Sequence, residues 1–253
     1  MKKYQHFGRA LALSSSLFMA SCQAPVEKND SAPNNTEVTH HTKTTEQAKD
    51  LPDAQTSDWE LLLVNKDHPL SKDYEASITF EEVDGEPMDA RIVDAYNEMK
   101  TAAKAAGYDL YLGSAYRSIE HQQYNYDWNV DFYMEEGLSE AEAKAKTEEL
   151  IAVPGYSEHH TGLALDILDA EWFQTHDDPY QADYDTQESQ HWLVKHAPDY
   201  GFILRYPKGK EKETGINYES WHFRYVGIEN AKYITEHQLT LEEYLKQLAG
   251  QEG

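Results

Sequence analysis

Large apolar residues are distributed unevenly along this chain, and their distribution limits where a core can form. Residues 23–50 carry Asn, Thr, Lys, Glu, Pro and Gln with almost no large apolar side chain, whereas apolar and aromatic residues recur throughout residues 51–253. A segment with so little apolar surface cannot offset the entropy lost on ordering. We therefore expect residues 22–50 to be a flexible tether. Residues 51–253 should form a single domain, because about 200 residues suffice for one sizeable core but hardly for two.

The composition is strongly acidic, which narrows the range of partners. The chain holds 46 Asp and Glu against 22 Lys and Arg, giving a formal net charge of -24. A surface of this sign repels the phosphates of nucleic acids, so we expect no nucleic-acid partner. Acidic chains can also be disordered, but 18 Tyr and 5 Trp indicate a packed fold with a solvated acidic face.

The N-terminal residues have the pattern of an export signal. Basic residues at positions 2, 3 and 9 precede or open an apolar run over residues 10–20, and small residues follow just before Cys22. This arrangement predicts a signal peptide over residues 1–21. The apolar run is too short to remain as a membrane span.

Cys22 is the only cysteine in the sequence, which rules out an internal disulfide and a zinc site built from cysteines. The run from Met19 to Cys22 resembles a bacterial lipobox, in which the cysteine is acylated and becomes the mature N-terminus. That resemblance implies a lipid anchor at Cys22 on the outer face of the bacterial cytoplasmic membrane, with the tether holding the domain toward the cell wall. An ordinary cleaved signal with an incidental cysteine is the alternative.

The hydrophobic periodicity of residues 51–253 predicts an α+β fold. We expect a buried strand over residues 59–65, ended by a turn at His68-Pro69, and a helix over residues 89–106 stopped by Gly107. The other expected elements are strands over residues 108–114, 162–168 and 221–226, a helix from Ser118, a helix over 139–150 opened by a capping box, and helices near 228 and 241. Such an order fits a small antiparallel sheet with helices packed on it better than a βαβ repeat.

A histidine, a glycine and an aspartate stand together around the start of the strand over residues 162–168. A strand beginning there would send its leucines to one face and Ala164 and Asp166 to the other. A chain reversal at Gly162 could then bring the His159 imidazole over the Asp166 carboxylate. An imidazole and a carboxylate together suit a hard-to-borderline divalent metal ion. The alternative is an ordinary surface histidine beside a strand-end aspartate.

A second segment places Glu219 three residues before His222, which opens the strand over residues 221–226. A zinc hydrolase needs three protein ligands, an open position and a separate carboxylate that can accept a proton. His159, Asp166 and His222 could supply the ligands, and Glu219 the proton acceptor. Alternatively, Glu219 and His222 form a surface pair and Trp221 is a core aromatic.

Taken together, the two segments carry the pattern Ser-x-His-x-x-Gly-x-Ala-x-Asp followed later by Glu-x-Trp-His. This pattern resembles that of the D-alanyl-D-alanine carboxypeptidase family related to VanY, and the resemblance extends upstream to residues 62–70 and 114–118. It covers about residues 59–227 and leaves out the signal peptide and the tether. The matching positions are Ser157, His159, Gly162, Ala164, Asp166, Glu219, Trp221 and His222.

The resemblance implies roles for these residues. It implies Zn2+ bound by His159, Asp166 and His222, with Glu219 as the general base. Arg117 would be the cation for the tetrahedral oxyanion or for the substrate carboxylate, with a surface salt bridge as the alternative. The residues implied as substrate contacts are Ser157, Tyr116, Gln122 (with Gln123 as its competitor) and Trp221, whose alternative is packing beneath the strand.

The function implied by the resemblance is removal of the terminal D-alanine from peptidoglycan stem peptides. By analogy with lipoprotein members of the group, we expect a monomer with L,D-carboxypeptidase activity on tetrapeptides, and D,D-carboxypeptidase activity on pentapeptides is the alternative. Further alternatives are an endopeptidase of the same zinc fold, a non-catalytic wall-binding lipoprotein and a solute-binding lipoprotein. A binding module has no need of a general base, so Glu219 and the three ligands count against the wall-binding lipoprotein. The short chain and the missing two-lobed repeat pattern count against the solute-binding lipoprotein.

Overall fold

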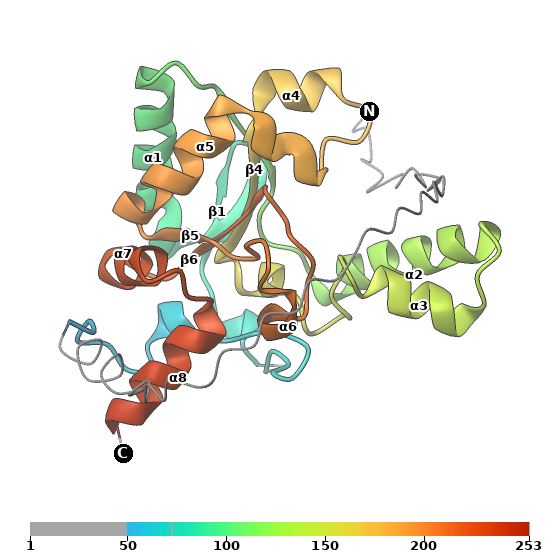
Figure 1. Cartoon of the computed structure of the whole chain (residues 1–253), viewed down its shortest axis with the longest axis horizontal. Helices are drawn as coiled ribbons and strands as arrows, with labels where there is room; N and C mark the ends of the chain where they lie inside the picture. Colours follow the sequence, from blue (N-terminus) through green and yellow to red (C-terminus); the bar gives the residue numbers. More distant parts are fainter. Residues whose placement is uncertain (1–49, 72, 253) are drawn as a thin grey trace, which may run out of the picture. The chain divides into compact units, whose positions relative to one another are not determined.

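Four strands form the sheet on which the rest of the fold is arranged (Figure 1). A computed structural model of the chain describes residues 50–71 and 73–252. The strands lie in the order β3-β4-β6-β5, and every neighbouring pair is antiparallel. Their bounds are Leu110–Ser114 for β3, Ala164–Asp169 for β4, Phe202–Leu204 for β5 and His222–Tyr225 for β6. This small antiparallel sheet with its helices confirms the predicted α+β class.

A separate hairpin joins β1 (Phe80–Val83) to β2 (Glu86–Asp89). Its two turn residues, Asp84 and Gly85, have φ values of 55° and 87°. Both values are positive, as a two-residue type I′ hairpin turn requires, and Asp-Gly is a dipeptide typical of that turn. The sequence therefore contained a signal for this hairpin that the prediction did not use.

The helices cover the sheet and extend to one side of it. In Figure 1, α1 and α5 lie side by side along the sheet, and α2 and α3 form a hairpin beside it. Their bounds are Val93–Ala105 for α1, Ile119–Glu135 for α2, Glu140–Thr147 for α3, Ala170–Thr175 for α4, Glu188–His196 for α5, Glu211–Thr214 for α6, Ile228–Glu236 for α7 and Leu241–Glu252 for α8. Short α4, α5 and α6 were not predicted.

The core confirms the predicted alternation along β4. Leu165 and Ile167 are fully buried, and they belong to one cluster with Tyr96 and Met99 of α1. Leu168 faces the other side, in a second cluster with Trp172, Tyr180, Tyr184 and Trp221. The sheet thus lies between two apolar layers, and β4 contributes to both.

Several predicted helix boundaries are confirmed by their caps. Ser118 accepts a hydrogen bond from the His121 backbone N–H at the start of α2, and the capping box of α3 forms between Ser139 and Glu142. Gly107 follows α1 with a φ of 97°. Helix α3 ends at Thr147 rather than at residue 150, residues 148–150 form a turn, and Ile151 packs into the apolar cluster between α2 and α3.

The predicted strand over residues 59–65 is wrong. Trp59–Leu61 forms a short 3-10 helix, η2, and Asn65 makes only an isolated bridge to His68. The backbone carbonyls that a neighbouring strand would satisfy bind a buried guanidinium instead. Arg224 Nη2 donates to the carbonyl oxygens of Glu60 and Leu62 at 3.0 and 2.8 Å. The segment is buried as predicted at Leu61, but it is not extended.

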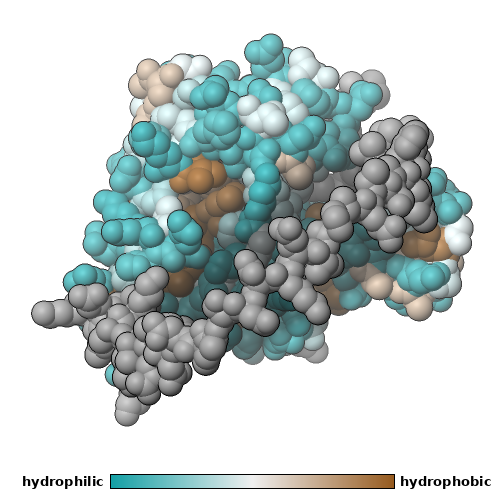
Figure 2. Space-filling view, in the orientation of Figure 1, coloured by the Kyte–Doolittle hydropathy of each residue, from teal (hydrophilic) through white to brown (hydrophobic). Residues whose placement is uncertain are grey.

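The surface agrees with the acidic composition. The face shown in Figure 2 is mostly hydrophilic, and exposed apolar residues are confined to a few patches. In the part of the chain that the structure describes, no helix is both long enough and apolar enough to cross a bilayer. The predicted signal peptide, Cys22 and all but the end of the predicted tether lie outside the described residues.

Gly162 is the glycine on which the approach to β4 depends, and we predict that Gly162→Ala is strongly destabilising. Its φ is 69°, and an added Cβ would lie 2.9 Å from the Asp89 backbone nitrogen. Left-handed strain of about 1–2 kcal/mol adds to overpacking of about the same size. Urea unfolding should show a loss of about 3 kcal/mol.

Gly137→Ala is the matched control for this substitution. Gly137 also has a positive φ, 99°, but a Cβ there would meet nothing within 4 Å. The control should therefore lose only the strain component, about 1–2 kcal/mol. Equal losses in the two variants would show that close packing against Asp89 is not what requires glycine at position 162.

Candidate metal centre and active site

Strand pairing brings together two residues that are 56 positions apart in the sequence numbering. In the β4–β6 register Asp166 lies opposite His222, and in the β3–β4 register Asp166 lies opposite Ser114. His159 comes from the 3-10 helix η5 (Glu158–Thr161), which Gly162 ends just before β4. His159, Asp166 and His222 are all at least 96% buried.

The atoms of this group are spaced as ligands of one metal ion would be. His159 Nε2 lies 3.3 Å from Asp166 Oδ2, and His222 Nδ1 lies 3.2 Å from Asp166 Oδ1. One potential ligand atom from each residue lies within 4.8 Å of the others. Two ligand atoms that are each about 2.1 Å from a tetrahedral zinc ion lie about 3.4 Å apart. The three side chains therefore fit a zinc ion.

A hydrogen bond determines which nitrogen the His159 imidazole directs toward Asp166. His159 Nδ1 lies 2.6 Å from the carbonyl oxygen of Ala115, to which it donates, so its Nε2 lone pair faces Asp166. Burial lowers the pKa of His159 to about 4, with Asp166 opposing the shift. The imidazole is therefore neutral at physiological pH, which is the form that binds metal ions.

The carboxylates around His222 favour a positive charge next to Asp166, either on the imidazole or on a bound ion. Burial lowers the pKa of His222, but the neighbouring carboxylates of Asp166 and Glu158 outweigh this effect and raise the pKa above its usual value, to about 9. Asp166 Oδ1 has no hydrogen-bond partner among the described residues. A buried carboxylate oxygen without a donor is costly unless a cation lies beside it. Either a proton on His222 or a metal ion would satisfy it.

Glu219 lies beside this group without belonging to it. Its Oε2 is 3.5 Å from His222 Nδ1, and the residue is 6% exposed. Burial raises the pKa of Glu219 to about 8, with the charge of His222 opposing and that of Asp166 adding to the shift. A nearby dication would favour the ionised carboxylate. A carboxylate in this place can accept a proton from a water between it and the three ligands.

Arg117 completes the polar side of the centre. Its Nη2 lies 3.7 Å from Asp166 Oδ2 and donates to Ser114 Oγ at 3.0 Å, while its Nη1 donates to Gln122 Oε1 at 2.9 Å. Gln122 is buried, whereas Gln123 is exposed and bonds Asp127. The structure thus brings Gln122, and not its competitor, to the centre.

Three predicted substrate contacts are engaged elsewhere. Ser157 Oγ accepts a hydrogen bond from the His159 backbone N–H at 3.4 Å and caps η5. The Tyr116 ring packs against Phe80, with 4.2 Å between the ring centroids. Trp221 is 6% exposed and packs edge-on against Tyr180 in the second apolar cluster. Their roles toward a substrate stay predictions.

Sequence reasoning missed two residues that touch His222. Tyr206 packs over it, with 4.8 Å between the ring centroids, and the Glu158 carboxylate faces its Nε2. Glu158 fills a variable position of the first motif, and Tyr206 lies outside both motifs. The adjacency of Glu158 to His159 was the one available signal.

A cavity of about 360 Å³ adjoins the centre. Its walls include Tyr206, which packs over His222, and Ala152, whose carbonyl oxygen accepts a hydrogen bond from Gln122. Lys66 and Glu148 also line the cavity and give it one group of each charge. The cavity is therefore connected to the centre through these two neighbours, and His159, Asp166 and His222 do not themselves line it.

Comparison with known proteins identifies the family. The sequence matches the VanY family, described as D-alanyl-D-alanine carboxypeptidase, over residues 85–228. The chain belongs to the VanY D-alanyl-D-alanine carboxypeptidase family. A D-alanyl-D-alanine carboxypeptidase of Enterococcus faecalis is 39% identical over 198 residues, which are 78% of this chain and 69% of that protein. The resemblance predicted from the two motifs is confirmed.

Solved structures of relatives agree with this assignment. A vancomycin-resistance D,D-pentapeptidase VanY, determined with Zn(II), is 39% identical with a TM-score of 0.66 over 74% of this chain and 99% of that one. The LdcB LD-carboxypeptidase, whose structure concerns peptidoglycan recognition, is 35% identical with a TM-score of 0.62 over 76% of this chain and 89% of that one. Zinc is thus present in a structure of this family.

We predict that Asp166→Asn abolishes tight zinc binding, because Asp166 is the anion that both imidazoles face. Affinity should fall by more than about 100-fold, beyond the range typical of residues that only support a ligand. The matched control is Asp169→Asn on the same strand, since Asp169 caps α4 through the Glu171 N–H at 2.9 Å. Zinc content after dialysis measures both variants. Retention of zinc by Asp166→Asn would contradict the assigned centre.

Proposed function

We propose that this protein is a zinc-dependent carboxypeptidase that removes the terminal D-alanine from peptidoglycan stem peptides. The observation that carries the proposal is the buried group of His159, Asp166 and His222 with a separate carboxylate, Glu219, 3.5 Å from one of its members. A zinc peptidase needs this combination, and a binding protein does not need Glu219. The family membership supports the same reaction.

Each polar residue has a task that follows from its position. Zinc held by the two imidazoles and Asp166 would polarise the scissile carbonyl and lower the pKa of water. Glu219 accepts the proton of the attacking water and returns it to the leaving amine of D-alanine. The low exposure of the centre keeps bulk water from screening these charges.

Arg117 supplies the positive charge that the developing oxyanion requires. Ser114 and Gln122 each accept a hydrogen bond from it, which fixes the plane of the guanidinium. Gln122 is held in turn by the Ala152 carbonyl at 2.7 Å. A donor held in place before the reaction costs no reorganisation when charge develops. Gln122 therefore acts here as the support of Arg117.

The preference we propose is L,D-carboxypeptidase activity on tetrapeptides. In such a substrate the residue before D-alanine is a diamino acid with a long side chain, whereas in a pentapeptide it is D-alanine with a methyl group. The cavity of about 360 Å³, one wall of which is Tyr206, offers room for the long side chain, and Tyr206 packs over His222. The likeness to the LdcB LD-carboxypeptidase supports this preference. D,D activity is the second candidate, supported by the likeness to the VanY D,D-pentapeptidase.

We also propose that the protein is held outside the cell by lipid at Cys22, with residues 22–50 as its tether and residues 51–253 as the catalytic domain. The lipobox-like sequence and the apolar-poor composition of residues 23–50 support this arrangement. A wall substrate requires an extracytoplasmic location. Metabolic labelling with a palmitate analogue, compared between the natural chain and Cys22→Ala, tests the anchor.

The reaction is tested by mass spectrometry of tetrapeptide and pentapeptide stems incubated with the purified full-length protein. We predict loss of one D-alanine from the tetrapeptide. In Glu219→Gln the rate should fall by about 10²- to 10⁴-fold while zinc stays bound, because the general base is lost and the ligands remain. Shortening of the pentapeptide alone would assign D,D activity. Shortening of neither peptide by the zinc-loaded protein would contradict the carboxypeptidase proposal.

For Arg117→Lys we predict a fall of about 10²- to 10³-fold in kcat, because a lysine cannot reproduce the forked donors of the guanidinium. Steady-state kinetics on the preferred peptide measures the change. The matched control is Arg91→Lys, since Arg91 is exposed, pairs with the buried Asp89 and lies outside the centre. A rise in KM with unchanged kcat would instead assign Arg117 to the substrate carboxylate.

A further inference from the structure

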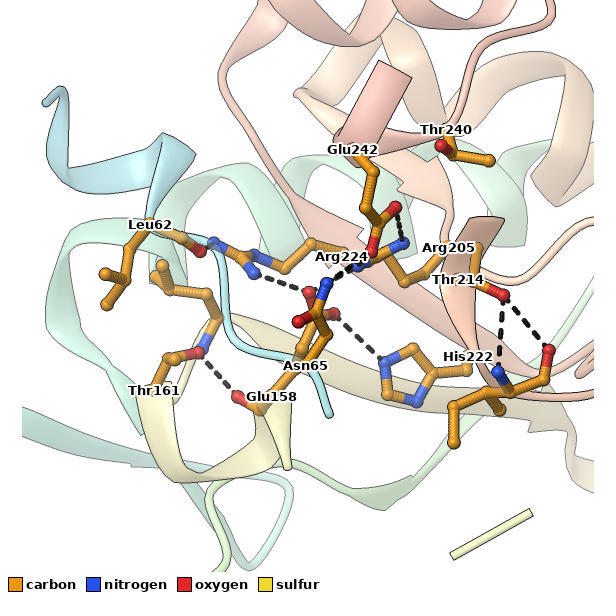
Figure 3. Close-up of polar contacts among 12 residues, drawn as sticks. Leu62, Asn65, Glu158, Thr161, Arg205, Thr214, His222, Arg224, Thr240 and Glu242 are labelled. Carbon is orange, nitrogen blue, oxygen red and sulfur yellow. Dashed lines mark hydrogen bonds and ion pairs between the residues drawn. The ribbon is translucent and has the colours of Figure 1, made fainter. Parts of the chain in front are cut away.

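We infer that Glu158 is a positioning residue for the metal centre, which holds His222 so that Nδ1 faces the metal. The inference rests on the proposed zinc-dependent function. Neither motif assigns a role to Glu158, which lies between Ser157 and His159 in the sequence. Its side chain is fully buried, and its carboxylate faces His222 (Figure 3).

The two oxygens of the Glu158 carboxylate have different partners. Oε1 accepts hydrogen bonds from Arg205 Nε and Arg224 Nη1, both at 2.8 Å. Oε2 lies 3.6 Å from His222 Nε2, slightly beyond normal hydrogen-bond length. Among the described residues neither Oε2 nor Nε2 has another hydrogen-bond partner, and both atoms are buried. Each is therefore available to the other alone.

This contact determines which nitrogen of His222 can bind a metal ion. A neutral imidazole carries one N–H and one lone pair. A carboxylate can only accept, so facing Glu158 keeps the N–H on Nε2 and leaves the lone pair on Nδ1. His222 Nδ1 is the nitrogen that lies 3.2 Å from Asp166 and 3.5 Å from Glu219. The Ala115 carbonyl performs the equivalent task for His159.

Glu158 is itself held from several elements of the fold. Arg205, next to β5, is fixed by two hydrogen bonds to Glu242 of α8, at 2.9 and 2.6 Å. Arg224 on β6 is fixed by the Glu60 and Leu62 carbonyls. Both arginines are fully buried. Two guanidinium groups on one oxygen leave the carboxylate no freedom to turn away from His222.

The test is Glu158→Gln in the full-length protein, with the zinc dissociation constant measured by chelator competition. The amide oxygen has to serve Arg205 and Arg224, so the NH2 group faces His222 and requires an acceptor at Nε2. The imidazole N–H then moves to Nδ1, where it competes with the metal ion. We expect zinc affinity to fall by about 10- to 100-fold. The absorption spectrum of the cobalt-substituted variant should shift as well.

Glu242→Gln is the matched control, because it also removes a buried carboxylate from Arg205 but does not face His222. It should lower the melting temperature and change the zinc dissociation constant by less than about 3-fold, since Arg224 still holds Glu158. Equal affinity in Glu158→Gln and the natural protein would overturn the inference. Equal weakening in both variants would also overturn it, because the effect would then come from the ion pairs alone.

A second measurement needs no variant. In the natural zinc-loaded protein labelled with ¹⁵N-histidine, NMR should show a slowly exchanging N–H at Nε2 of His222. A proton at Nδ1, or a solvent-exchanging Nε2, would overturn the inference even if Glu158→Gln fails to fold. If the natural protein binds no zinc at all, the proposed function fails instead, so the two failures are distinguishable.

Discussion

The register between β4 and β6 is the constraint on which the metal centre depends. It places Asp166 opposite His222, and a slip of one residue would turn Asp166 to the other face of the sheet. The same slip would remove Leu165 and Ile167 from the core formed with α1. Burial of such a side chain contributes about 2 kcal/mol. The apolar packing on one face of β4 therefore fixes the polar chemistry on the other.

The buried ion pairs around Glu158 are better explained by the centre than by stability. Burying charged groups costs several kcal/mol for each ion, and apolar residues of similar volume often serve stability equally well. Here Glu158, Arg205, Arg224 and Glu242 balance one another in charge and connect β6, α8 and the segment before β1 (Figure 3). The irregular path of residues 59–62 follows from the same network, because Arg224 binds their carbonyls.

Sequence alone predicted what local patterns and spacing determine. Helical spacing predicted α1, a capping box predicted the start of α3, and two motifs brought His159, Asp166 and His222 into one hypothesis. The sequence patterns did not predict contacts between segments that lie far apart in the chain. Nothing near Leu62 shows that a guanidinium from position 224 will replace a neighbouring strand. The choice between Gln122 and Gln123 likewise depends on how α2 is rotated over Arg117, which a five-residue spacing does not define.

The net charge of the protein sets how it can bind an anionic stem peptide. With a formal charge of -24, long-range electrostatics repel a substrate that ends in a carboxylate. At physiological ionic strength this repulsion is screened over about 8 Å, so only charges near the bound peptide matter. Arg117, 3.7 Å from Asp166 and 92% buried, is a positive charge at the centre itself. Recognition of the peptide therefore depends on short-range contacts near the centre and not on steering by the surface charge.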